Sequence, residues 1–247
     1  MGTTKLTRKE ILAEDPVHHA MMRLLELLRE RGNLIAAGAG AVVLIALGIY
    51  FGIQYLERRE VRAQDQLSRG MDFYHARIDP AAPDDPYAKG GDPLFRTEEA
   101  KYKAAAKEFA EVVSSGPSTL AVMARYYLGL TQLQLGQKDE AVRSLEAVRS
   151  NTASRTVAYL AKKVLANHYL ETGNSSGAVE LLEGMIKDPQ CELPRASLQL
   201  DLARALETQG KRDQAIKVLR EARRNESRSM LLSQVIQELN RLEGISQ

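Results

Sequence analysis

The segment YLGLTQLQLGQKDEAVRSL, residues 127–145, carries the pattern that decides the fold. Its Leu128, Gly136, Ala141 and Leu145 recur twice more along the chain at a spacing of 37 residues, and alanine stands in place of Gly129 both times. Such a repeat predicts units of two antiparallel helices, joined at a glycine-containing turn, with small residues where the helices cross and leucine between units. The fold class that follows is all-α. The repeated positions are Leu128, Leu165 and Leu202; Gly129, Ala166 and Ala203; Gly136, Gly173 and Gly210; Ala141, Ala178 and Ala215; and Leu145, Leu182 and Leu219.

This arrangement resembles the tetratricopeptide repeat, whose signature has Leu-Gly in the first helix, a glycine at the turn, and alanine with a large apolar residue in the second helix. Leu128-Gly129, Gly136, Ala141 and Leu145 match that signature, and Tyr169 stands at the family's aromatic position in the second unit. The chain departs from the family in its period of 37 rather than about 34 residues, in lacking tryptophan and in lacking the terminal proline of each unit.

The repeats predict that residues 57–247 form one domain. An earlier, degenerate unit is expected at 57–115, because Ala105 and Phe109 lie 36 residues before Ala141 and Leu145, and Gly70 can serve its first helix. Prolines and paired glycines predict an exposed loop at 78–97 inside that unit. The remaining units are expected at about 119–150, 155–187 and 194–224, followed by a capping helix at 228–243.

An uncharged run from Gly32 to Leu56 precedes the repeats. As a helix, residues 33–56 reach about 36 Å, enough to cross a hydrocarbon core of about 30 Å. The run is longer than a signal-peptide core and lacks a small-x-small cleavage site, so we expect an uncleaved transmembrane helix. Residues 1–32 form an N-terminal tail in which the apolar rhythm from Val17 to Leu28 predicts an amphipathic helix. Whether that helix lies on the membrane or packs against a partner helix stays open.

Glycines in the span share nearly one helical face, since Gly40, Gly48 and Gly52 are eight and then four residues apart. A face of this kind permits close contact between membrane helices, although glycine is common in such helices. Six Lys/Arg lie in the tail and four within twenty residues after the span, which favours a cytoplasmic N-terminus.

No constellation for catalysis, cofactor or metal is visible, so the sequence predicts a protein that is not an enzyme. The four histidines are scattered, and Cys191 is the only cysteine. The chain has 34 Lys/Arg and 32 Asp/Glu, of which six Lys/Arg and five Asp/Glu lie in residues 1–56. The repeat domain therefore has 28 basic and 27 acidic residues. A nearly neutral domain predicts no nucleic-acid partner, and no small-molecule substrate is indicated.

The resemblance to tetratricopeptide repeats implies a concave groove, lined by the first helix of each unit, that binds extended peptides or partner helices. Lys163 and Asn167, one turn apart, are similar to half of the carboxylate clamp of chaperone-binding members of the family, with Arg204 as a third contributor. A solvated lysine on a helix face is the alternative reading of Lys163. The groove residues expected on this basis are Met123, Tyr126, Leu130, Leu133, Leu160, Lys163, Asn167, Leu170, Leu200 and Arg204.

The order of tail, span and repeats resembles that of the ancillary Sec translocon subunits of the bacterial inner membrane, which have one span and a periplasmic, chaperone-associated repeat domain. That resemblance rests on architecture and implies a non-enzymatic scaffold whose partners are the Sec translocon, periplasmic chaperones or secretory chains. The alternative is the reversed topology, an import receptor or assembly factor whose repeats face the cytosol.

Overall fold

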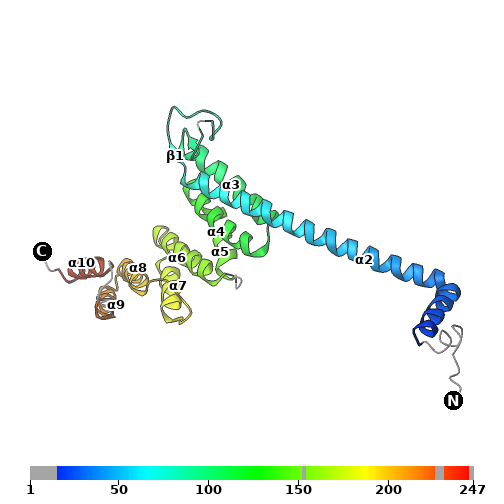
Figure 1. The fold of residues 1–247 in the computed structure, drawn as a ribbon. Helices are drawn as coiled ribbons and strands as arrows, with labels where there is room; N and C mark the ends of the chain where they lie inside the picture. The colour runs from blue at the N-terminus through cyan, green and yellow to red at the C-terminus, as the bar shows by residue number, and fades with distance from the viewer. Residues whose placement is uncertain (1–15, 89, 152–153, 226–230, 245–247) are drawn as a thin grey trace, which may run out of the picture. The chain divides into compact units, whose positions relative to one another are not determined.

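The computed structural model describes residues 16–88, 90–151, 154–225 and 231–244. The chain is built from paired helices that follow one another in sequence order (Figure 1), and one pair of short strands interrupts them. The elements are α2 (Pro16–His75), β1 (Arg77–Ile78), β2 (Leu94–Phe95), α3 (Glu98–Ser115), α4 (Ser118–Gln134), α5 (Lys138–Arg149), α6 (Arg155–Glu171), α7 (Ser175–Lys187), α8 (Arg195–Thr208), α9 (Arg212–Asn225) and α10 (Leu231–Glu243).

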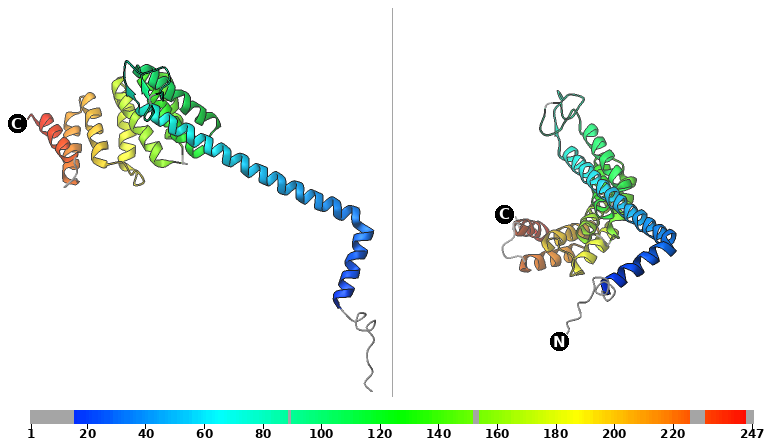
Figure 2. Two further views of the ribbon diagram at one scale, coloured as in Figure 1. Left: turned by 45° about the horizontal axis from the view of Figure 1, so that its top comes forward. Right: turned by 45° about the vertical axis from the view of Figure 1, so that its right-hand side comes forward.

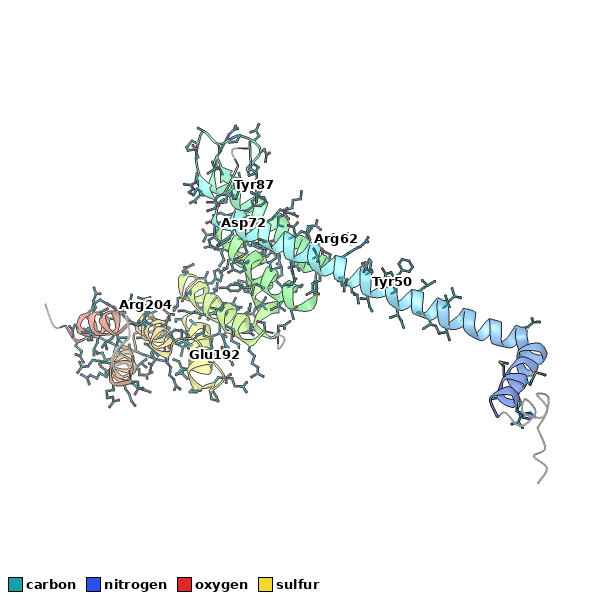
Figure 3. The ribbon with its side chains drawn as sticks, in the orientation of Figure 1. Tyr50, Arg62, Asp72, Tyr87, Glu192 and Arg204 are labelled. Atoms are coloured by element: carbon teal, nitrogen blue, oxygen red, sulfur yellow. The ribbon has the colours of Figure 1, made fainter. Side chains whose placement is uncertain are left out.

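Helix α2 is a single element of 60 residues that contains the end of the tail, the uncharged run and the first helix of the repeat domain. The chain divides into two compact units at the bond between Arg58 and Arg59. In the first unit the large apolar side chains from Val42 to Leu56 are exposed, and Tyr50 projects away from the helix (Figure 3). Within the described residues one helix, from Gly40 onward, is long and apolar enough to span a membrane, with a mean hydropathy of 1.6 and none of that window buried.

The second unit stacks helix pairs α4/α5, α6/α7 and α8/α9 in chain order (Figure 2). Each pair turns at a glycine whose φ is positive, 73° at Gly136, 82° at Gly173 and 74° at Gly210. In the first pair the amide of Gly136 donates to the carbonyl of Leu133, and that of Gln137 donates to Gln132. This pattern closes a helix end in the left-handed conformation that only glycine adopts without strain. The expected glycine turns are confirmed.

Small residues stand where the two helices of a unit cross. A Cβ on Gly129 would lie 2.8 Å from Cγ of Leu145, too close for a carbon contact. Ala166 and Ala203, at the same position in the next two units, are completely buried. Leu145, Leu182 and Leu219 are likewise completely buried, as the 37-residue pattern predicts. The tetratricopeptide-like architecture is therefore confirmed from residue 118 onward.

The degenerate unit pairs the last part of α2 with α3. A Cβ on Gly70 would lie 2.6 Å from the ring of Phe109, which reproduces the contact between Gly129 and Leu145 one unit later. Ala105 and Phe109 are completely buried, and Ala63 is only 2% exposed. The guanidinium of Arg59 donates to the carbonyls of Ser115 and Gly116, at the end of α3. The first helix of the array is thus fixed by both apolar and polar contacts.

The loop inserted between the two helices of that unit is ordered by aromatic contacts. Strands β1 and β2 pair in parallel over two residues each. Phe73, near the end of α2, lies 5.8 Å from the ring of Tyr87 and 5.3 Å from that of Phe95, centroid to centroid. Nε of Arg96 donates to the carbonyl of Ala82 at 2.6 Å. These contacts attach the loop to the end of α2, while most of the loop residues that the structure describes remain exposed (Figure 3).

Helix α10 covers the end of the array. Val235, Leu239 and Leu242 are almost completely buried and belong to the same apolar cluster as α7, α8 and α9. The guanidinium of Arg212, at the start of α9, donates twice to the carbonyl of Leu242, at 2.8 and 2.5 Å. A terminal repeat needs such a cap to hide its apolar side. The beginning of the expected cap, 228–230, lies outside the described residues.

Candidate functional site

The first helices of successive units lie next to one another, since α4 contacts α6, α6 contacts α8 and α8 contacts α10. We call the surface that these four helices share the first-helix face. All ten residues predicted to line a groove belong to α4, α6 or α8. The structure gives them very different exposures and partners, and these divide the face into an apolar end on α4 and a charged end on α6, α8 and α10.

The apolar end consists of Met123, Tyr126, Leu130 and Leu133. Met123 is the most exposed of them, at 40%, and the other three are half-buried. The ring of Tyr126 meets that of Tyr127 edge-on, with centroids 5.4 Å apart. Burial raises the pKa of Tyr126 to about 12, so its hydroxyl stays protonated even in mildly alkaline solution. This end offers an uncharged surface of one flexible thioether beside an aromatic ring.

The predicted apolar residues further along mostly contribute to packing. Leu160 and Leu170 are half-buried, and Leu170 packs against the main apolar cluster. Leu200 is only 4% exposed and belongs to that cluster. Its assignment to a groove surface is therefore corrected: the helix register of α8 turns Leu200 into the interior. Asn167 is exposed on α6.

Lys163 already has a protein partner. Its Nζ donates to Oγ of Ser197 at 2.5 Å and lies 3.4 Å from Oδ2 of Asp201, both on α8. Asp201 is 8% exposed, and no hydrogen bond from a described residue reaches its Oδ2, so the ion pair with Lys163 is a charge contact without hydrogen-bond geometry. An incoming carboxylate would meet the negative charge of Asp201 beside the lysine. This arrangement favours an ion pair between units over a preformed clamp.

Arg204 is an exposed cation of the charged end (Figure 3). Its Nη1 lies 3.6 Å from Oδ1 of Asp201, while 58% of its side chain remains exposed. A second ion-pair group follows one unit later, where the guanidinium of Arg241 binds Glu207 at 3.0 and 2.5 Å and Glu238 at 3.0 and 2.9 Å. The hydrogen bond from Arg241 lowers the pKa of Glu238 and raises that of Arg241 itself. The charged end thus pairs most of its own charges.

Four members of these ion pairs and one hydrogen-bond partner, Ser197, were not among the sequence-predicted site residues. They are Ser197, Asp201, Glu207, Glu238 and Arg241. A signal existed, because Asp201 and Glu238, like Arg204 and Arg241, are 37 residues apart. The repeat period therefore continues into α10, which occupies the place of a first helix in a further unit.

The described residues contain no group of three or more His, Cys, Asp or Glu side chains that could hold a metal ion. His168 is 8% exposed, and its Nδ1 has no hydrogen-bond partner among them. Cys191 is half-buried and free.

The predicted contact face on α2 is open. A Cβ added to Gly40, Gly48 or Gly52 would meet no heavy atom within 4 Å. The space beside these glycines is therefore available to another helix, and their role in membrane contact remains a prediction.

Comparison with known proteins places the repeats in a family. The tetratricopeptide repeat model matches residues 98–156, 128–190 and 163–229, a continuous stretch longer than half of the chain. No curated protein matches the sequence. Among solved structures, the nearly identical TPR-like repeats of a putative kinesin light chain from Podosopora anserina are 25% identical, with a TM-score of 0.49, and cover 60% of this chain and 80% of that one. A substituted variant of that protein is 24% identical, also with a TM-score of 0.49, and covers 60% and 79%. By the match of its repeats, the chain belongs to the tetratricopeptide repeat family.

Proposed function

We propose that this protein is a membrane-anchored scaffold that binds an extended segment of another protein along its first-helix face. The observation that carries the proposal is the run of exposed apolar side chains from Val42 to Leu56 of α2, which precedes the repeat units in the chain. Repeat domains of this family present surfaces for protein partners. A span in the same helix would hold that surface at a bilayer and restrict its partners to those that reach the membrane.

We infer the following arrangement from the order of tail, span and repeats. Residues 1–32 lie in the cytoplasm, 33–56 cross the bacterial inner membrane once, and 57–247 face the periplasm. The partners are then the Sec translocon, a periplasmic chaperone or emerging secretory chains. Support comes from the resemblance in architecture and from the larger number of Lys/Arg in the tail. The scaffold uses no cofactor and carries out no reaction.

Topology is tested with a single accessible cysteine. Glu192 is exposed on the loop between α7 and α8 (Figure 3), so Glu192→Cys in a Cys191→Ser background offers one reactive thiol. A membrane-impermeant maleimide should label it in intact spheroplasts. Protection until lysis would reverse the topology and leave the cytosol-facing alternative.

Partner binding is tested by crosslinking from two matched positions in native membranes. A photo-reactive residue in place of Met123 lies at the apolar end, whereas one in place of Lys187, whose side chain is 74% exposed on α7, lies outside the first-helix face. We expect a Sec translocon subunit, a chaperone or a secretory chain to be captured from position 123 and not from 187. Equal capture from both positions would contradict the assignment of the first-helix face.

A further inference from the structure

Helix α9 differs in charge from the helices that occupy the same place in the preceding units. The second helices α5 and α7 have net charges of zero and minus one, because three basic residues meet three acidic ones in α5 and one meets two in α7. Helix α9 has five basic and two acidic residues, a net charge of plus three. The repeat fold does not require this excess, since α5 and α7 occupy equivalent places without it.

The cations of α9 also lack the local acidic partners that two of the three cations of α5 and the single cation of α7 have. Arg143 and Arg149 on α5 pair with acids three residues away, at 3.0 and 2.5 Å, and Lys187 on α7 pairs with Glu183 at 2.8 Å. On α9, Arg220 binds Glu243 at 2.7 Å and remains 63% exposed. Three further cations of α9 lie within four residues of Arg220. Among the residues that the structure describes, no acid forms an ion pair with any of these three. Those three are Lys217, Arg223 and Arg224.

A hollow of about 430 Å³ adjoins these cations. The hollow is open to solvent, and all the described residues that line it belong to α9. The positions 213, 217, 220 and 224 follow one another by four, three and four residues, so their side chains lie along one face of the helix. The described residues that line the hollow are Asp213, Ile216, Lys217, Arg220, Arg223 and Arg224.

The helix dipole explains only part of this pattern. Basic side chains in a last turn stabilise a helix, which accounts for Arg223 and Arg224. The helix dipole does not account for Lys217 and Arg220, which lie in the middle of α9. At the equivalent positions 37 residues earlier, α7 has the acidic residues Glu180 and Glu183. Three of the four cations are arginines, whose planar guanidinium binds phosphate through two parallel hydrogen bonds.

We propose that the exposed face of α9 is a binding site for a phosphate-bearing anion, supplied either by a free phosphorylated molecule or by a phospholipid headgroup. Lys217 and Arg220 contact one side of the anion, and Arg223 and Arg224 contact the other. This site lies on a second helix and is separate from the first-helix face of the proposed function.

The test compares two double variants at repeat-equivalent positions. Lys217→Gln with Arg223→Gln removes two cations from α9, and Arg143→Gln with Arg149→Gln removes the same charge from α5, 74 residues earlier. The full chain, held in nanodiscs of neutral lipid, is titrated with pyrophosphate, and separately mixed with vesicles of phosphatidylglycerol or phosphatidylcholine. Circular dichroism confirms that both variants keep their helices.

We expect saturable binding of pyrophosphate, of phosphatidylglycerol vesicles, or of both, and the responding arm identifies the source of the phosphate. Since each phosphate-facing cation near a surface contributes about a fivefold factor, the α9 variant should bind about 25-fold more weakly. The α5 variant should bind like the unmodified chain. An equal loss in both variants, or binding of neither probe, would overturn the proposal. So would tighter binding of an oligoglutamate peptide than of either phosphate probe, because it would assign the face to acidic protein segments.

Discussion

Both ends of the repeat array have an apolar core, but they differ in the side-chain contacts that accompany it. At the N-terminal end, an aromatic cluster of Tyr74, Tyr102, Phe109 and Tyr127 packs with ring centroids 5.6 to 5.8 Å apart. At the C-terminal end, the charged end of the first-helix face joins α6, α8 and α10 through ion pairs. Aromatic packing depends little on salt, whereas ion pairs between partly exposed groups weaken as salt screens them. The ion pairs at the C-terminal end should therefore respond more strongly to salt than the aromatic packing at the N-terminal end.

The largest expected effect is at the aromatic cluster. Phe109→Ala removes a completely buried ring that fills the space over Gly70. Truncating a buried phenylalanine costs about 3–5 kcal/mol in free energy of unfolding. Urea unfolding of the full chain in detergent should show this loss equally at low and high salt. A loss that changes strongly with salt would contradict the division between the two ends.

Gly70→Ala tests the same contact from the other side. The new methyl group would lie 2.6 Å from the Phe109 ring, so the ring or the helix must shift. We expect a destabilisation of about 1–3 kcal/mol, typical of overpacking in a tight core. Combining Gly70→Ala with Phe109→Ala should relieve most of this cost, because the methyl group then fills part of the space that the ring leaves.

Arg241→Gln breaks the ion pairs with Glu207 and Glu238 at the opposite end. The Arg241 side chain is 52% exposed and that of Glu238 only 17%, so solvent screens part of the interaction. We expect a loss of about 1 kcal/mol in thermal or urea unfolding at low salt. The loss should shrink at about 1 M salt, where the screening length is only about 3 Å, unlike that of Phe109→Ala. Equal losses at both salt concentrations would remove the proposed difference between the ends.

Acid should weaken the charged end first. The hydrogen bond from Arg241 holds the pKa of Glu238 below its ordinary value of 4.5. A carboxylate with a lowered folded-state pKa contributes stability above its unfolded pKa and loses that contribution as pH falls through the folded pKa. The stability difference between the unmodified chain and Arg241→Gln should therefore be constant above about pH 5.5 and fall below about pH 4.5. A difference that grows on acidification would contradict the assigned pKa direction.

The smallest effect is expected on α5, away from both ends. Arg143 pairs with Glu140 at 3.0 Å, and the two side chains are 69% and 50% exposed. Arg143→Gln should change the free energy of unfolding by about 0.3 kcal/mol, since exposed pairs one turn apart contribute little. A larger change would show that the outer face of α5 takes part in interactions between units.

The repeated part of the fold could be predicted because its determinants are local. Gly136 stands 37 residues before Gly173, and each ends its helix by the same left-handed turn. Gly70 and Phe109 were assigned to one unit across a long insertion, and the crossing of its two helices places the small residue opposite the large one. The candidate site was predicted less well. Leu200 was expected at a surface and is buried, and the partner of Lys163 was not foreseen.

By itself, the sequence determined the helix pairs, their turns, the apolar run in α2 and the membership in the tetratricopeptide repeat family, since each depends on the type of residue at a fixed spacing. Only the tertiary structure decided which charges neutralise one another. Asp201 pairs with Lys163, 38 residues earlier in the chain, and Arg241 pairs with Glu207, 34 residues earlier. The rotation of each helix about its axis decides such contacts, and it is fixed only when the apolar faces of neighbouring units pack together. Among the described residues, the same packing leaves Lys217, Arg223 and Arg224 of α9 without an acidic ion-pair partner, a property that composition averaged over a neutral domain conceals.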